Sequence, residues 1–424
     1  MNWIDKKHLL PGALAICMAL SAGPLSIAQG MTLPSPSGQA ATSLPSDRLR
    51  FFLVAAVCCG SALAQGAAPF TVSSPLEYQV FQRRTRLNGT ILVRGSVLTT
   101  MRVEARVKGT SLEGSLPGRW WRMTVDPTKK EFSGELPVIA GGFYRIEVRA
   151  TDGAGKQTLV TVPNVGVGEV FVISGQSNST NYGEVPQKTE TGMVTSFSGT
   201  EWSLANDPQP GVQDNSKKGS FIPSFGDALY RRYHVPIGIA SVGHGSTSVR
   251  QWLPAGSPIL VMPTMTKYVK TETDGTLVSD GTLFDGMMAR IRQLGPHGFR
   301  GLLWHQGESD SHQPPEHDID AATYRSMMVS LIQASRKEAG WDFPWFVAQA
   351  SYHTSEDTGC PPIREAQRSL WQRDLALEGP DTDTLTAAYR LNGGKGTHLN
   401  NAGLKAHGLL WADKASQYLD RILR

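Results

Sequence analysis

Two different spacings of apolar residues divide this chain. From about residue 68 to 164, apolar and polar residues alternate in TILVRGSV, MRVEARVKG and YRIEVRATDG, and Gly, Asp-Gly and Pro turn signals separate these segments. A period of two buries one face of a strand and wets the other, so each segment predicts a β-strand. We therefore expect a small all-β sandwich domain over residues 66–165.

After residue 165, short apolar runs alternate with longer amphipathic segments. The runs are EVFVISG, PIGIASVG, FRGLLWHQG, PWFVAQAS and TLTAAYRL, and the predicted helices lie at about 220–233, 283–294, 321–339, 361–376 and 400–423. Apolar runs that lack alternation indicate strands buried on both faces. Residues 166–424 therefore predict an α/β domain whose parallel sheet is covered by helices on both faces.

The first 65 residues contain two apolar segments, each preceded by two basic residues. One runs from Leu9 to about Ala28, and the other is FFLVAAVCCGSALAQ, which ends at Gln65. The second is too short for a helix that crosses a bilayer of roughly 30 Å, and its Ala-Leu-Ala is typical of a signal-peptide cleavage site. We predict that residues 1–65 are a removed export region, and that the protein is secreted or periplasmic without stable membrane insertion.

Composition excludes some classes of protein. Of the 424 residues, 40% are hydrophobic and 18% are charged, which is typical of a globular protein. The formal net charge of +4 is not concentrated in a Lys/Arg block, so we expect no nucleic-acid partner. Three of the four cysteines precede residue 65, which leaves Cys360 without a partner for an intrachain disulfide.

Polar, glycine-spaced turns follow the predicted strands. They are GQSN, GHGSTS, HQGESD and, before the last helix, GTHLN. Because ligands bind outside the carboxyl ends of parallel strands, these turns predict one site. Ser177 needs a base to become a nucleophile, and chain position favours His398. The N–H groups of Ser177 and Gly245 and the amide of Gln306 are candidate oxyanion donors. Each residue alone also fits a structural role, and Gln306 and Glu308 also fit a buried network that holds the turns.

The four turns together resemble a known family. GQSN, GHGSTSVRQW, WHQGESD and HLNNAG are similar to the blocks of the sialate O-acetylesterase-like branch of the SGNH hydrolases, and the resemblance extends from Gly168 to the C-terminus. It implies a flavodoxin-like three-layer α/β/α fold and removal of acetyl groups from sugars without metal or cofactor. It also implies Ser177 as nucleophile, His398 as base, and an oxyanion hole containing Gly245 and Gln306.

The chain departs from the family where an acid is expected. The family usually carries Asp two or three residues before the histidine, whereas this chain has Lys395 and Gly396. An acid orients and stabilises the histidine without making the bond. We therefore expect Glu308 or Asp310 to support His398, or a Ser-His dyad to act alone.

Further residues have weaker assignments. Gln176 and Asn178 are expected to brace the serine turn, and His353 is a candidate substrate contact. An acidic loop has residues of metal-ligand type, but we interpret it as solvated and expect no metal there; its members are His312, Glu316, His317 and Asp318.

The sequence and the resemblance predict a secreted serine esterase that deacetylates carbohydrates. O-acetylated sialic acid is the favoured substrate, and acetylated plant or microbial polysaccharide is the second. Two other hypotheses are a catalytically degenerate carbohydrate-binding protein, suggested by the missing Asp, and a short-chain lipid esterase of the same superfamily.

Overall fold

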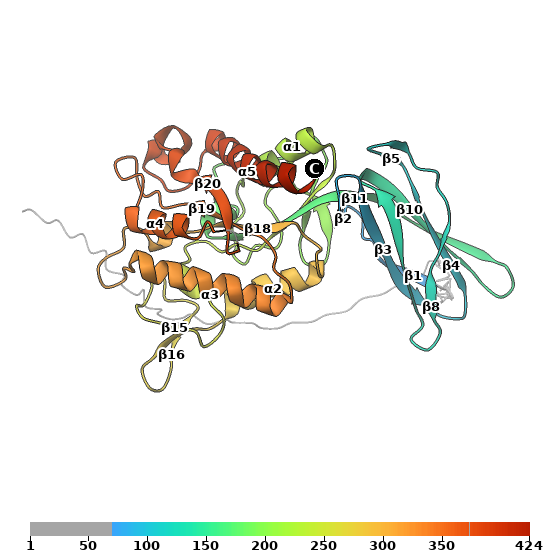
Figure 1. The fold of residues 1–424 in the computed structure, drawn as a ribbon, viewed down its shortest axis with the longest axis horizontal. Helices are drawn as coiled ribbons and strands as arrows, with labels where there is room; N and C mark the ends of the chain where they lie inside the picture. Colours follow the sequence, from blue (N-terminus) through green and yellow to red (C-terminus); the bar gives the residue numbers. More distant parts are fainter. Residues whose placement is uncertain (1–69, 373) are drawn as a thin grey trace, which may run out of the picture. The chain divides into compact units, whose positions relative to one another are not determined.

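The 19-residue strand β11 (Gln157–Gly175) joins the two patterns seen in the sequence (Figure 1). The computed structural model describes residues 70–372 and 374–424, so the predicted export region lies outside the described residues. Burial alternates along β11 as far as residue 164 and is continuous from Val165. The strand first pairs antiparallel with β10 (Gly141–Thr151), then parallel with β14 (Ile237–Ser241) and β18 (Gly301–His305).

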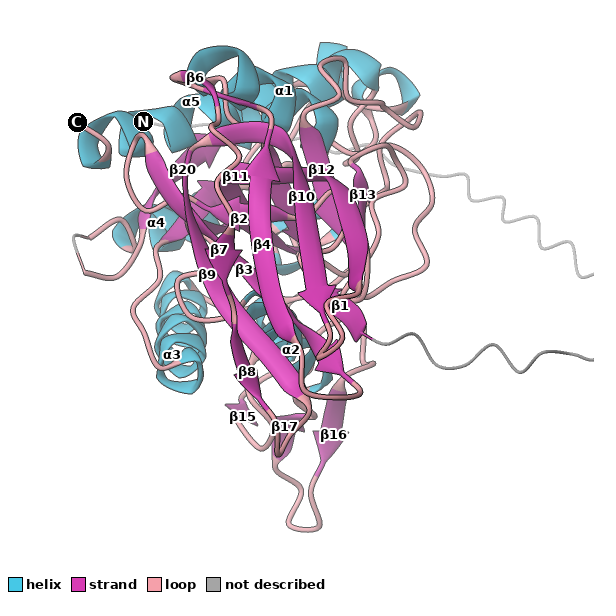
Figure 2. Ribbon diagram, turned by 90° about the vertical axis from the view of Figure 1, so that its right-hand side faces the viewer, coloured by secondary structure: helices cyan, strands magenta, loops and turns pink. Residues whose placement is uncertain are grey.

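The described residues before β11 form strands (Figure 2). One sheet has the order β1-β3-β9-β8, and β4, β5, β7 and β10 belong to the sheet that contains β11. Ile91, Val93, Val103 and Ile146, which occupy alternate positions in their strands, are fully buried in a common core. The strands are β1 (Phe70–Ser74), β2 (Val80–Gln82), β3 (Asn88–Val97), β4 (Arg102–Lys108), β5 (Thr110–Ser111), β6 (Gly114–Ser115), β7 (Trp121–Arg122), β8 (Thr124–Asp126) and β9 (Glu131–Ile139).

After residue 165 the fold is mixed α/β. The strand order is β13-β12-β14-β11-β18-β19-β20, and each neighbouring pair is parallel except β12 and β13. The remaining strands of this sheet are β12 (Val194–Phe197), β13 (Trp202–Leu204), β19 (Trp345–Gln349) and β20 (Leu377–Asp381). A separate three-stranded sheet consists of β15 (Pro258–Ile259), β17 (Leu277–Ser279) and β16 (Val269–Thr271).

Helices contribute to two hydrophobic clusters. Residues of α1 (Ile222–Tyr233) and α5 (Asn401–Ile422) belong to one cluster, and those of α2 (Thr282–Leu294), α3 (Ala321–Ala339) and α4 (Pro361–Ser369) to the other. Figure 1 shows α1 and α5 above the strands and α2 and α3 below them. Asp320 and Asn400 accept backbone N–H bonds at the starts of α3 and α5, as N-cap residues do.

Two details of the predicted pattern are wrong. TLTAAYRL is not a strand: it contains the 3-10 turn η5 (Ala387–Tyr389), and its Leu385 packs against Leu399 and Leu404. The last parallel strand is β20, whose LEGPD sequence has no apolar run, because it pairs only with β19 in this sheet. The helix predicted at 361–376 ends at Ser369.

Strand β11 crosses residue 165, and the division into domains at 66–165 and 166–424 stays a prediction. Within the described part of the chain, no helix combines the length and the apolarity that a membrane span requires.

Candidate active site

Ser177 lies at the carboxyl end of β11, in the 3-10 turn η1 (Ser177–Ser179). Gly175 has φ +127°, and a Cβ there would lie 2.0 Å from the carbonyl oxygen of His305, so glycine lets the two strands end this close together. Ser177 is 4% exposed. Neither its hydroxyl nor its backbone N–H has a hydrogen-bond partner among the described residues, which leaves both groups available to a substrate.

His398 lies just before α5, with its ring centroid 5.0 Å from that of Tyr182. The preceding carbonyl, of Thr397, accepts hydrogen bonds from Arg390 Nη1 (2.5 Å) and Asn178 Nδ2 (3.2 Å). Burial lowers the pKa of His398 below its usual value, while the charge of Glu308 acts in the opposite direction. The imidazole is therefore neutral near pH 7, as a general base must be.

Glu308 offers a charged and partly unsatisfied carboxylate. Its Oε1 accepts a hydrogen bond from Asn178 Nδ2 at 2.8 Å and lies 2.9 Å from His305 Nε2. Burial by itself raises the pKa of Glu308, but the charge and hydrogen bond of His305, together with Asn178, lower it to about 2. Its Oε2 is buried and has no hydrogen-bond partner within the described residues. Asn178 thus connects Glu308 with the loop that carries His398.

The three candidate catalytic side chains do not hydrogen-bond to one another in this structure, as far as the described residues show. Catalytic hydrogen bonds are often long before substrate binds. His398 and Glu308 interact through charge in this state. The negative carboxylate favours the protonated imidazole and so partly offsets the lowering of the His398 pKa by burial.

Asp310, the other candidate acid, is fully engaged elsewhere. Its Oδ1 accepts from Ser248 Oγ (2.5 Å) and Arg250 Nη2 (3.1 Å). Its Oδ2 accepts from Val249 N (2.8 Å) and Gln306 Nε2 (2.7 Å). The side chain is 0% exposed, so the structure places Asp310 in a network that holds two strand-end turns together.

Two of the candidate oxyanion donors already have acceptors. The N–H of Gly245 donates to Asp214 Oδ2 at 2.6 Å, and Gln306 Nε2 donates to Asp310 and, at 3.2 Å, to Thr247 O. Gln306 is 0% exposed and fits the buried-network alternative. Of the three predicted donors, the Ser177 N–H is the one without an acceptor among the described residues.

The two remaining predicted site residues, Gln176 and His353, lie in different surroundings. Gln176 Oε1 accepts from the N–H groups of Gly307 (3.2 Å) and Ser309 (3.0 Å), so it braces the turn after β18. His353 is half exposed and lies against His312 and Asp357.

Sequence interpretation missed Arg390 and Asp214. Arg390 fell inside the wrongly predicted strand TLTAAYRL, and Asp214 is 31 residues from the N–H that it binds. No local spacing links either residue to the four turns.

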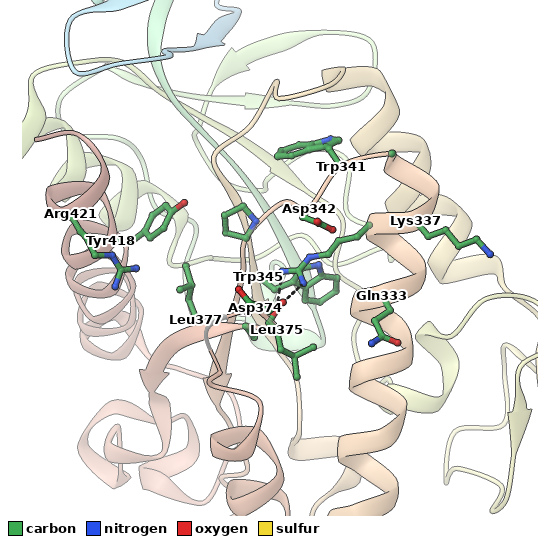
Figure 3. A pocket seen from close by; sticks show the side chains of 14 residues that line it. Gln333, Lys337, Trp341, Asp342, Trp345, Asp374, Leu375, Leu377, Tyr418 and Arg421 are labelled. Carbon is green, nitrogen blue, oxygen red and sulfur yellow. Dashed lines mark hydrogen bonds between the residues drawn. The ribbon is translucent and has the colours of Figure 1, made fainter.

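The pocket drawn in Figure 3 is not the expected site of catalysis. This pocket, about 730 Å³ in volume, lies at the amino ends of β19 and β20, where Trp345 and Leu377 begin the strands. None of the candidate catalytic residues lines it. Sites in parallel α/β sheets lie at the opposite, carboxyl ends of the strands.

A serine at the exit of a parallel strand, with a histidine and a buried carboxylate nearby, is typical of ester hydrolases. Residues 167–417 match the family described as carbohydrate esterase, sialic acid-specific acetylesterase. This match spans more than half of the 424 residues, and the chain belongs to this family. The family resemblance of the four sequence blocks is thereby confirmed.

Solved structures are similar at low sequence identity. The crystal structure of XAC1771, a novel carbohydrate acetylesterase from Xanthomonas citri, has a TM-score of 0.53 and 20% identity, and the match covers 83% of this chain and 76% of that chain. A protein from Arabidopsis thaliana has a TM-score of 0.43 and 18% identity, with 60% of this chain and 98% of that chain covered. The likeness to XAC1771 supports the fold alone. No protein of curated function matches the chain.

Proposed function

We propose that the protein is a secreted serine esterase that removes acetyl groups from carbohydrates. Family membership supports an esterase that acts on acetylated carbohydrate. The observation that carries the proposed chemistry is the unpartnered Ser177 hydroxyl at a strand exit, on the same edge as a neutral histidine and an ionised carboxylate. The proposed domain has the three-layer SGNH arrangement, with the all-β sandwich as an accessory domain.

Ser177 Oγ attacks the acetyl carbonyl carbon while His398 takes the hydroxyl proton. Collapse of the tetrahedral intermediate breaks the bond to the sugar oxygen, which receives the proton from His398. Water then attacks the acetyl carbonyl carbon with His398 again as base. Collapse of this second intermediate breaks the bond to Ser177 Oγ, which takes the proton from His398, and the acetic acid leaves and ionises to acetate. The two half-reactions return Ser177 and His398 to their starting protonation states and need no cofactor.

Glu308 is the proposed acid of a triad. The Asp expected before His398 is absent, but Glu308 is ionised and keeps one buried oxygen without a partner. His305 and Asn178 hold its other oxygen and thereby fix the orientation of the carboxylate. The free oxygen stabilises the imidazolium that forms during the attack.

The oxyanion is proposed to form against the N–H of Ser177. Gly245 contributes its N–H only when Asp214 withdraws, since the carboxylate holds that N–H and its charge repels an oxyanion. Gln306 is proposed to position the site without contacting the oxyanion, because its hydrogen bonds to Asp310 and Thr247 connect the turns of the site.

O-acetylated sialic acid is the proposed first substrate, on the family's description, and acetylated xylan-like polysaccharide is the second. Acetate release from both, measured for the wild type, Ser177→Ala and Ser179→Ala, tests the proposal. Ser179 is the matched control because its hydroxyl, in the same turn, donates to Gln176 O at 2.6 Å. We expect release by the wild type and Ser179→Ala and none above background by Ser177→Ala. Sugar binding without release by the wild type favours the degenerate binding protein instead.

A further inference from the structure

Three potential metal ligands converge beyond the carboxyl ends of β18 and β19. Asp357 Oδ2 lies 2.7 Å from His312 Nδ1 and 3.9 Å from His353 Nδ1. One ligand atom from each residue lies within 4.8 Å of the other two. The two imidazole rings are stacked, with centroids 5.1 Å apart and an interplanar angle of 17°. We propose that His312, His353 and Asp357 bind a divalent transition-metal ion, with Zn²⁺ as the best match.

The distances fit such an ion after small side-chain movements. Ligands about 2.0–2.1 Å from a tetrahedral Zn²⁺ are about 3.3 Å from one another. The two distances from Asp357 Oδ2 lie on either side of this value. The third pair, His312 and His353, has ligand atoms within 4.8 Å of each other. Because the side chains of His353 and Asp357 are 56% and 47% exposed, they have room to close these distances around an ion.

The donor set favours a borderline metal over calcium or magnesium. Two imidazole nitrogens and one carboxylate oxygen suit Zn²⁺, Co²⁺ or Ni²⁺, whereas Ca²⁺ and Mg²⁺ prefer oxygen ligands. Three protein ligands also leave at least one position for water. The set differs from the acidic loop noted in the sequence, since His317 Nδ1 instead lies 2.9 Å from the carbonyl oxygen of Met262.

The proposed ligands come from two different loops, so a bound ion would have a structural role. His312 follows the turn η3 (Glu308–Asp310), which contains the proposed acid. His353 and Asp357 belong to the loop after β19, where the N–H groups of His353 and Thr354 donate to Asp357 O at 3.2 and 3.1 Å. A bound ion therefore cross-links two strand-exit turns and restrains the turn that holds Glu308. It takes no part in the bond-breaking steps assigned to Ser177.

Zn²⁺ titration into the EDTA-treated protein, followed by calorimetry, tests this site. We expect one ion per chain, and a loss of affinity of about 100-fold or more in His353→Ala and in Asp357→Asn, because removing a ligand exceeds the 10- to 100-fold cost of losing an outer-shell partner. His234→Asn is the matched control: His234 is exposed, as His353 is, but lies outside the cluster. Its affinity should equal that of the wild type.

Two independent readouts keep the test decisive. The midpoint of thermal unfolding should rise with Zn²⁺ in the wild type and His234→Asn but not in His353→Ala. Co²⁺ bound in place of Zn²⁺ should give the visible absorption of a four-coordinate site, which Asp357→Asn abolishes. Absence of Zn²⁺ binding by the wild type, or equal binding by all variants, overturns the proposal. Neither result bears on whether Ser177 is the nucleophile.

Discussion

Replacing Glu308 by Gln is the perturbation that best separates a triad from a dyad. The amide keeps the size of the side chain and an oxygen that accepts the Asn178 hydrogen bond, but it removes the charge. That charge is present at neutral pH because the pKa of Glu308 is about 2. Two opposite unit charges about 4 Å apart, the separation of a close ion pair, interact by about 4 kcal/mol at an effective dielectric of about 20, and we take this as the size of the Glu308–imidazolium interaction.

An interaction of this size corresponds to about 1,000-fold in kcat, and an amide in the acid position of a serine-protease triad costs about 10,000-fold. We therefore expect Glu308→Gln to lower kcat for acetate release by about 1,000- to 10,000-fold with a smaller effect on KM. Removal of the carboxylate also removes the effect that raises the pKa of His398. The acid limb of the remaining kcat/KM profile should consequently move to lower pH.

The matched comparison is Asp310→Asn, measured by acetate release and by thermal unfolding. Because Asp310 pairs with the fully buried Arg250, its neutralisation should cost about 3–5 kcal/mol of stability. A kcat for Glu308→Gln within about tenfold of the wild type, with only a lower unfolding temperature, refutes the triad and leaves a structural pair with His305. A loss of kcat without loss of stability in Asp310→Asn would make Asp310 the acid.

Three more tests concern the pH profile, the buried Glu169 with its partners Arg83 and Arg300, and the loop before His398, the proposed base. Because burial holds the pKa of His398 below 6.5 and only the neutral form accepts a proton, kcat/KM should rise with pH to a plateau with its midpoint below pH 6.5; a midpoint above that value contradicts the burial argument. Glu169→Gln leaves Arg83 and Arg300 facing a buried neutral group, and urea unfolding should show a loss of about 3–5 kcal/mol, whereas a loss under about 1 kcal/mol would be that of an exposed pair. Arg390→Met removes the shorter of the two hydrogen bonds to the carbonyl preceding His398 and should lower kcat by about 100-fold, with partial recovery in Arg390→Lys; an unchanged kcat would deny this arginine a positioning role.

The elements of the fold that show a local pattern of apolar residues could be predicted from the sequence. Continuous apolar runs predicted β11, β14, β18 and β19, because strands inside a sheet are buried on both faces. Strand β20 has LEGPD and no such run, since it pairs only with β19 in this sheet. TLTAAYRL has a strand-like composition. It forms no strand, because Leu385 packs in a small cluster with Leu399 and Leu404, and the buried Arg390 side chain donates a hydrogen bond back to Leu385 O.

In the candidate site, too, local sequence predicts some features, while others depend on residues that are distant in the chain. The placement of Ser177 and Glu308 in turns at strand exits could be predicted, because the apolar strands before them are evident in the sequence, whereas their catalytic roles stay a prediction. The carboxylate that holds the Gly245 N–H could not, since Asp214 reaches it from a separate loop. For Gln306 the sequence left two alternatives, an oxyanion donor or a buried network, and its hydrogen bond to Asp310, which favours the network, depends on three-dimensional packing.

The most direct test of the central claim is to look for an acetyl group on Ser177 during turnover. The purified protein is mixed with 4-nitrophenyl acetate, quenched in acid at the earliest accessible time, digested, and examined by peptide mass spectrometry. We expect acetylation of the peptide that contains Ser177, at that serine, and no acetylation in Ser177→Ala, which should also release no acetate. Acetate release at the wild-type rate by Ser177→Ala, or an acetyl group on a different catalytic residue, would contradict that claim.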